Sequence, residues 1–192
     1  MKKILLLLCR GVEIYEAASF YDVLGWSGTY GEAVKVVSVG LQPEVHGTFG
    51  IKIIPDSLLS DVDMEEFDAI AIPGGFEIYG YYEEAYSEAV VNLIRRFEEL
   101  GKPIASICVG ALPVANTGIL KGRRATTYHG VRRKQLASFG VNVVDEPIVK
   151  DGNVITSTSP ATAMEVAFEL LARITSDENA SRIRELMGFT QP

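Results

Sequence analysis

The chain has few cysteines and no excess of positive charge. Two cysteines in 192 residues provide neither a disulfide framework nor the ligand spacing of a zinc site. Acidic residues outnumber basic residues by 25 to 18, and the net charge of −7 leaves no basic surface for the phosphates of a nucleic acid. We therefore expect no nucleic-acid partner, no metal site and a reducing, cytoplasmic location.

Long hydrophobic runs and phosphate-binding glycine motifs are also missing. The N-terminal stretch MKKILLLLCR resembles a signal peptide, but its apolar run is short and Arg10 and Glu13 follow at once. No apolar stretch approaches the roughly 20 residues that a membrane-spanning helix needs. The segment GGFEIYG lacks the lysine of a P-loop and the spacing of a dinucleotide-binding motif. The sequence thus predicts no membrane segment, and we expect the protein to act without a cofactor.

Short apolar runs alternate with longer amphipathic segments along the chain. Runs typical of buried parallel strands cover residues 3–9, 34–40, 68–75 and 102–110. Helical patterns cover residues 15–27, 84–100, 111–120, 159–174 and 176–189. This alternation predicts an α/β fold with a mainly parallel sheet. Because 47% of the residues are hydrophobic and no linker interrupts the pattern, we expect residues 1–192 to form one domain.

Two segments depart from this alternation. Residues 44–62 are too polar and broken for a core helix, and we interpret them as an excursion that contains a short extended pair. Residues 141–157 resemble a second pair, in which the sequence KDGN is a turn signal between two strand-like segments.

The stretch ASICVGALPVA places Cys108 where a buried strand meets a helix. In doubly wound sheets, ligands bind beyond the carboxyl ends of the strands. Small neighbours permit the sharp turn of a nucleophile elbow, and the amides of the following helix would lower the pKa of the thiol below its free value of about 8.5. The alternative is a small buried hydrophobe. We expect that fate for Cys9, since no glycine elbow follows it.

Tyrosines and arginines near these segments allow two interpretations each. Four tyrosines in residues 79–86 follow the glycine pair, and they either roof the pocket or pack against a partner subunit. The basic run at 132–135 either holds a substrate anion near the pocket or is a solvated charged surface.

Four ordered motifs together resemble one protein family. ASICVGA, AIPGG, GVEIYEAASFYDVL and GRRATTYHG, followed by the helix TSTSPATAMEVAFELL, are similar to the ThiJ/PfpI family of the class I glutamine amidotransferase-like superfamily. Within that family they look most like the branch of the parkinsonism-associated deglycase. The resemblance implies a flavodoxin-like three-layer sandwich, a homodimer and a nucleophilic cysteine at the elbow.

The resemblance also assigns roles to individual residues. The nucleophile falls on Cys108, and the carboxyl group beside it falls on Glu16 rather than on the neighbouring Glu13. Gly74 and Gly75 follow a strand, as in the family, where the amides that match Gly75 and Val109 point at one oxyanion. Taken alone, Glu16 would be a first-turn acid that favours the helix dipole, and the glycine pair would be an ordinary turn.

The match is loosest at the histidine. Family members often have ATTH where this sequence has ATTYHG, so that Tyr128 takes the aligned position and His129 follows it. His129 is nevertheless the candidate proton carrier, because the other imidazole, His46, lies in the polar excursion. Val109 stands where the protease-like relatives have histidine, which argues against peptidase activity.

The family leaves three functions open. The first is a cofactor-free glyoxalase or deglycase, in which a cysteine attacks small reactive carbonyl compounds. The second is an oxidation-sensing or chaperone-like protein without a substrate. The third is a hydrolase or hydratase that acts on a carbon–nitrogen bond. A shared fold does not decide among them.

A homodimer is expected on two grounds. One is the resemblance. The other is the aromatic surface of the first helix, with Phe20, Tyr21, Leu24 and Trp26, which exceeds what one small core covers.

Overall fold

Both faces of the first strand are buried, which explains its uninterrupted apolar sequence. In the computed structural model, which describes residues 1–189, Ile4, Leu6 and Leu8 belong to the core on one side of the sheet. Leu5, Leu7 and Cys9 belong to the core on the other side. Successive side chains of a strand point to opposite faces, so a strand between two layers of helices needs apolar residues at every position.

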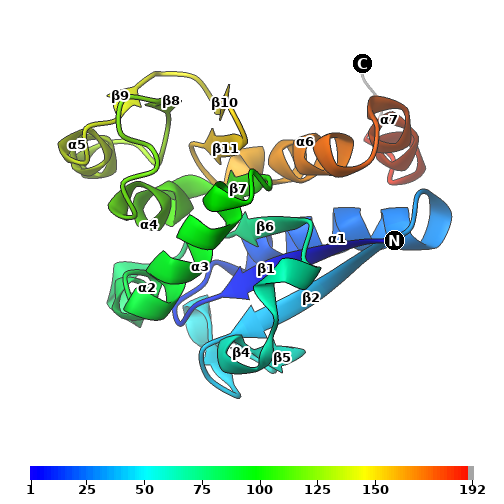
Figure 1. Cartoon of the computed structure of the whole chain (residues 1–192), viewed down its shortest axis with the longest axis horizontal. Helices are drawn as coiled ribbons and strands as arrows, with labels where there is room; N and C mark the ends of the chain where they lie inside the picture. Colours follow the sequence, from blue (N-terminus) through cyan, green and yellow to red (C-terminus); the bar gives the residue numbers. More distant parts are fainter. Residues whose placement is uncertain (190–192) are drawn as a thin grey trace.

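Seven strands form the central sheet, in the order β10-β11-β7-β6-β1-β2-β5 (Figure 1). Their bounds are β1 (Lys2–Leu8), β2 (Val34–Gly40), β5 (Ser57–Leu58), β6 (Ala69–Ile72), β7 (Ile104–Ser106), β10 (Ile148–Asp151) and β11 (Val154–Ser157). All neighbours pair in parallel except β10 and β11, which are antiparallel. The predicted α/β fold with a mainly parallel sheet is confirmed.

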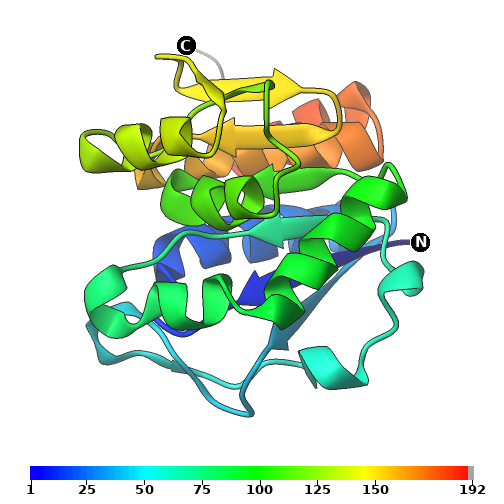
Figure 2. The same cartoon turned by 60° about the vertical axis from the view of Figure 1, so that its left-hand side comes forward.

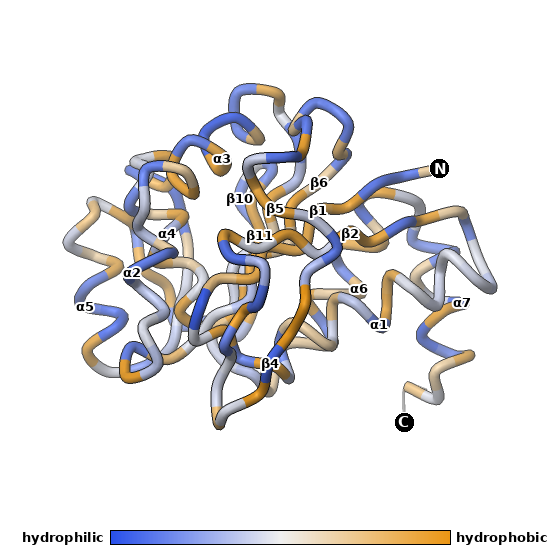
Figure 3. Tube along the Cα trace, turned by 90° about the horizontal axis from the view of Figure 1, so that it is seen from below, coloured by the Kyte–Doolittle hydropathy of each residue, from blue (hydrophilic) through white to orange (hydrophobic). Residues whose placement is uncertain are grey.

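Helices cover both faces of the sheet and complete three layers (Figure 2). One face carries α1 (Ile14–Tyr30), α6 (Ala163–Ile174) and α7 (Asp177–Leu186). The other carries α2 (Tyr81–Ala85), α3 (Glu88–Glu99), α4 (Ala111–Asn116) and α5 (Val131–Ser138). The central strands are mostly hydrophobic, whereas α5 has a hydrophilic stretch (Figure 3). No helix within residues 1–189 is long and apolar enough to cross a membrane.

Two predicted helices are shorter than their apolar patterns. The predicted helix 84–100 is divided, because Ser87 caps α3 by accepting a hydrogen bond from the Val90 N–H at 3.4 Å. The predicted helix 111–120 ends at Asn116, where the Thr117 hydroxyl donates to the Val114 carbonyl at 2.6 Å and Gly118 adopts a φ of 89°. Local hydrogen bonds therefore decide where these helices end.

The two excursions contain short strands. Within 44–62, β3 (Val45–His46) and β4 (Lys52–Ile53) form the expected antiparallel pair. In the second segment the KDGN turn joins β10 to β11, with Gly152 at a φ of 59°. The earlier part of that segment behaves differently, because β9 (Asn142–Val143) pairs with β8 (Arg124–Ala125). Six short 3-10 helices complete the fold: Thr48–Gly50, Leu59–Asp61, Met64–Glu66, Glu77–Tyr79, Cys108–Gly110 and Pro160–Thr162.

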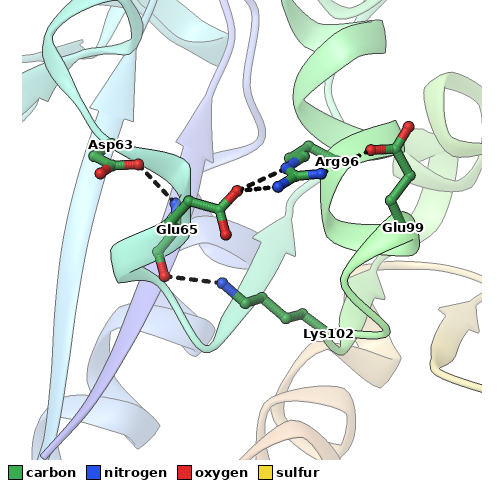
Figure 4. Close-up of polar contacts among 5 residues, drawn as sticks. All are labelled: Asp63, Glu65, Arg96, Glu99 and Lys102. Carbon is green, nitrogen blue, oxygen red and sulfur yellow. Dashed lines mark hydrogen bonds and ion pairs between the residues drawn. The ribbon is translucent and has the colours of Figure 1, made fainter.

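A polar cluster ties the crossover before β6 to helix α3 (Figure 4). The Arg96 guanidinium donates to Glu65 through Nε at 2.7 Å and to Glu99 through Nη1 at 3.0 Å. Lys102 donates to the Glu65 carbonyl at 3.0 Å, and Asp63 accepts from the Glu65 N–H at 3.0 Å. These groups are largely exposed, so the cluster orients the crossover more than it stabilises the fold.

The aromatic surface of α1 is smaller than expected. Phe20 and Leu24 are buried in the core, Trp26 is half-buried, and Tyr21 is exposed. An apolar groove of about 560 Å³ runs along this helix, with Tyr15, Tyr21, Ile54 and Met164 among its walls. The homodimer remains a prediction.

Two glycines of α1 are exposed yet differ in their surroundings. A Cβ added at Gly25 would meet nothing within 4 Å, whereas one at Gly28 would lie 2.3 Å from the Val34 carbonyl oxygen. We expect Gly25→Ala to raise the free energy of unfolding by about 0.5–1 kcal/mol, since glycine is costly inside a helix. Gly28→Ala is expected to lower it by about 1 kcal/mol or more. Urea denaturation measures both, and equal shifts would contradict the packing of α1 on β2.

Candidate active site

Three loops meet at the carboxyl ends of β1, β6 and β7. These strands are parallel neighbours, so the segments that follow them leave the sheet at the same edge. The loop after β1 and the loop after β6 are joined directly, because the Phe76 N–H donates to the Gly11 carbonyl and the Glu13 N–H donates to the Gly74 carbonyl, both at 2.9 Å. The segment after β7 begins with Cys108. Each of these three segments contributes groups to the site.

Cys108 stands on a strained elbow. Its φ of 55° lies in the left-handed region that residues with a side chain rarely adopt. The turn passes close to β6, since a Cβ at Gly110 would lie 2.6 Å from the Ile72 carbonyl oxygen. The buried Thr127 hydroxyl donates to the Cys108 carbonyl at 2.8 Å and holds the elbow from the other side. A half-buried thiol on such a turn has the placement of a nucleophile.

Glu16 is fully buried beside this thiol, in the first turn of α1. Its Oε2 accepts a hydrogen bond from the Gly74 N–H at 2.6 Å. Its Oε1 is buried and has no nitrogen or oxygen partner within residues 1–189. The Cys108 thiol is the group next to it, and the interaction of the two side chains affects the pKa of both. The carboxyl group therefore bridges the glycine loop and the elbow.

Burial governs the protonation of this pair. It raises the pKa of Glu16 to about 8, although the Gly74 hydrogen bond works in the opposite direction. Burial and a charge on Glu16 raise the pKa of Cys108, whereas the Val109 N–H, which donates to the sulfur, lowers it. With a pKa of about 8, Glu16 is mostly protonated and uncharged at neutral pH. At that pH it therefore places no negative charge beside the sulfur that would oppose ionisation of the thiol. The expectation that helix amides alone would lower the thiol pKa overlooked the larger effect of burial.

The predicted oxyanion donors lie beside the same pair. The point where a Cβ of Gly74 would stand is 2.9 Å from Glu16 Oε2 and 3.1 Å from the Val109 nitrogen. The Gly75 N–H donates to no acceptor within the described part of the chain. Position 75 requires glycine, because a Cβ there would lie 2.3 Å from the ring of buried Tyr81. Two backbone donors thus border the cavity with the sulfur.

These groups open into a cavity of about 250 Å³. Its lining consists of Glu13, Glu16, Gly75, Phe76, Glu77, Tyr82, Cys108, Val109, Tyr128, Arg132 and Pro160. The tyrosine cluster and the basic run, each with two interpretations above, both contribute to it. Arg132 pairs with Glu77 at 2.5 Å and lies 5.1 Å from the centre of the Tyr82 ring, which stacks on Tyr86. We call Arg132, Glu77 and Tyr82, which all line the cavity, its roof.

The structure places the predicted His129 away from the cavity lining. Tyr128 lines the cavity, whereas His129 is exposed and lies outside its lining. The two rings lie 4.0 Å apart, at an interplanar angle of 33°. Both residues lie in a bend, and the His129 ring lies against the Tyr128 ring without reaching the cavity lining.

Other cavity residues carried no clear signal in the sequence. Glu13 was set aside in favour of Glu16, yet both line the cavity. Phe76, Glu77 and Pro160 lie on loops and match no chemical motif. No group of three or more histidine, cysteine or acidic residues that could hold a metal ion occurs within residues 1–189.

A family model described as DJ-1/PfpI matches residues 2–173. The chain belongs to the DJ-1/PfpI family. It is 31% identical to protein dj-1beta of Drosophila melanogaster over 184 residues, which are 95% of this chain and 94% of that protein. The crystal structure of that fly protein superposes with a TM-score of 0.87 and covers 97% of both chains. The resemblance inferred from the four motifs is therefore confirmed.

Two other members of the DJ-1/PfpI family show its range. The DJ-1 homolog A of Arabidopsis thaliana is 30% identical over 97% of this chain, which spans only 46% of that longer protein. A deglycase of Pyrococcus horikoshii is 35% identical over 117 residues, which are 61% of this chain and 68% of that protein. The family thus includes relatives named as enzymes.

The coupling of Glu16 to Cys108 predicts a measurable change in the thiol. In Glu16→Gln the neutral amide cannot place a charge beside the sulfur, and its carbonyl oxygen replaces Oε2 as the acceptor of the Gly74 N–H. We expect the pKa of Cys108 to fall by about one unit or more. The pH dependence of alkylation by iodoacetamide measures it, and buried Cys9 should react only after unfolding. If the midpoint pH of Cys108 alkylation stays the same or rises, the charge of Glu16 does not influence the thiol.

Proposed function

We propose that the protein is a cofactor-free enzyme of the glyoxalase or deglycase type, which uses Cys108 to attack small reactive carbonyl compounds. The observation that carries the proposal is a buried carboxyl group, Glu16, beside the Cys108 thiol on its strained elbow, in a cavity of about 250 Å³. An acid and a nucleophile in contact are what addition to an aldehyde requires. The Pyrococcus relative named as a deglycase supports the same class of chemistry.

The first step is the addition of the Cys108 thiolate to the aldehyde carbon of a 2-oxoaldehyde. A carbon–sulfur bond forms while Glu16 gives its proton to the aldehyde oxygen, so that a neutral hemithioacetal and a Glu16 carboxylate result. The N–H groups of Gly75 and Val109 border the sulfur and stabilise negative charge on that oxygen during the addition.

The second step is an internal oxidation and reduction. Glu16 removes the hydrogen from the former aldehyde carbon and returns a proton to the neighbouring ketone carbon, while the hydroxyl proton passes from the first oxygen to the second. The aldehyde carbon becomes a thioester and the ketone becomes an alcohol, so no external oxidant is needed. Hydrolysis then releases a 2-hydroxy acid and restores the thiolate and the protonated Glu16.

A second candidate function, oxidation sensing, is favoured by the contrast between the two cysteines. Cys108 is half-buried and opens into the cavity, whereas Cys9 is buried. A protonated Glu16 would donate a hydrogen bond to a sulfinate at Cys108. Because this function needs no substrate, a sensor forms sulfinic acid under mild peroxide but produces no hydroxy acid from an aldehyde.

Lactate formation decides between these functions. We expect the purified protein to convert methylglyoxal into lactate without glutathione, and Cys108→Ser to lower turnover by about a hundredfold or more. Cys9→Ser is the matched control and should keep its activity, since Cys9 lies outside the cavity. Absence of lactate from the wild-type protein would overturn the enzymatic proposal.

The position of His129 gives a separate expectation. Because this residue is exposed and outside the cavity lining, His129→Ala should keep turnover within about threefold of the wild type. Lactate production measures it at several pH values. A loss of a hundredfold would show instead that the imidazole reaches the reacting atoms.

A further inference from the structure

Glu13 is a buried residue whose carboxyl group has no part in the steps above. The residue is only 8% exposed, and it lines the cavity together with Cys108 and Glu16. Its backbone is fixed on both sides, because its N–H donates to the Gly74 carbonyl at 2.9 Å and its carbonyl accepts from the Ala17 N–H at 3.1 Å. The position of this carboxyl group is therefore set by the same loops that build the site.

The side chain of Glu13 does not cap helix α1. Glu13 is the N-cap residue of α1, where a side-chain oxygen usually accepts a hydrogen bond from the first turn. No such bond forms, and within residues 1–189 the hydrogen bonds and ion pairs of the cavity acids are those of Glu16 and Glu77, not of Glu13. An acid held in a cavity wall without a partner has its oxygens free for a ligand.

The other carboxyl groups of the cavity are already engaged. Glu16 accepts from the Gly74 N–H and lies against the sulfur. Glu77 pairs with Arg132 and has a side chain that is 65% exposed. Glu13 is thus the one cavity carboxyl group within the described residues that is both buried and unpaired. Its charge influences the pKa of Glu16 and of Cys108, so it lies within electrostatic range of both.

We propose that Glu13 is the general base that activates the water for hydrolysis of the Cys108 thioester. This inference rests on the proposed function and names the group that completes it. Two acids in different environments are a common basis for dividing proton transfers between them. Glu16, against the sulfur, serves the addition and the proton shift, whereas Glu13, open to the cavity, serves the water.

The step balances without any other reactant. A water oxygen forms a bond to the thioester carbon while Glu13 takes a proton from that water. The carbon–sulfur bond then breaks, and the sulfur leaves as the thiolate, because Glu16 is a carboxylate after the proton shift. The proton that Glu13 took from the water passes to Glu16, so the products are a 2-hydroxy acid and the thiolate beside a protonated Glu16, which is the state that begins the cycle.

Glu13→Gln removes the base and keeps the size of the side chain. We expect steady-state lactate formation to fall by about a hundredfold, which is the usual contribution of a general base. The earlier steps remain, so Cys108 should accumulate a lactoyl thioester. After acid quenching and removal of small molecules, mass spectrometry detects this adduct, and hydroxylamine then cleaves it, whereas a hemithioacetal is lost on dilution. Glu13→Asp, which retains a carboxyl group, should recover part of the turnover and serves as the test should Glu13→Gln not fold.

Glu83→Gln is the matched control, because it makes the same change at an exposed glutamate outside the cavity lining, and it should neither accumulate the thioester nor lose turnover a hundredfold. If Glu13 only affects the charge around the sulfur, Glu13→Gln will change the alkylation of Cys108 without accumulating thioester, and the inference is wrong. If the wild type forms lactate and Glu13→Gln matches it, only this inference fails. If the wild type forms none, the proposed function fails with it.

Discussion

The site depends on the hydrogen bond from the Gly74 N–H to Glu16 Oε2. At 2.6 Å it joins the loop after β6 to the first turn of α1, while the same carboxyl group lies against the thiol that follows β7. One buried side chain therefore sets the spacing of three loops that are far apart in the sequence. Removing either partner would leave a buried polar group unsatisfied, which costs more than the bond itself contributes. The buried position of Glu16 therefore has two effects. It raises the pKa of the carboxyl group, and it sets the distance between the loop after β6 and the Cys108 thiol.

The fold bears a cost for this arrangement. A residue such as Cys108 with a positive φ costs about 1–3 kcal/mol, which the surrounding hydrogen bonds must offset. Glu16 adds a dependence on pH, because its pKa rises from 4.5 to about 8 on folding. Between these values the unfolded chain has lost a proton that the folded chain retains, so this contribution to stability declines as the pH rises from about 4.5 to 8. Strain and desolvation are thus concentrated at the residues assigned to chemistry.

The sequence predicts the layers of the fold better than the ends of its elements. Apolar residues at every position of Lys2–Leu8 require burial on both faces, and this signal is local. Helix ends depend on single hydrogen bonds, such as the one that Ser87 accepts. In the sequence, one capping residue is a weaker signal than the apolar pattern that continues on both sides of it. At the site, Cys108 and Glu16 stand in motifs and are visible in the sequence. Arg132 meets Tyr82 and Glu77 across about 50 residues, and no local pattern encodes that contact.

The roof of the cavity is held less firmly than its floor. The ion pair between Arg132 and Glu77 links α5 to the turn at Glu77–Tyr79, at a cavity of about 250 Å³. Glu77 is mostly exposed, and ion pairs of that kind contribute only about 0–1 kcal/mol. Opening the roof on that side therefore costs little, whereas the floor with Glu16 and Gly75 is fixed by buried contacts. The mouth of the cavity can therefore change its width while Glu16 and Gly75 stay in place.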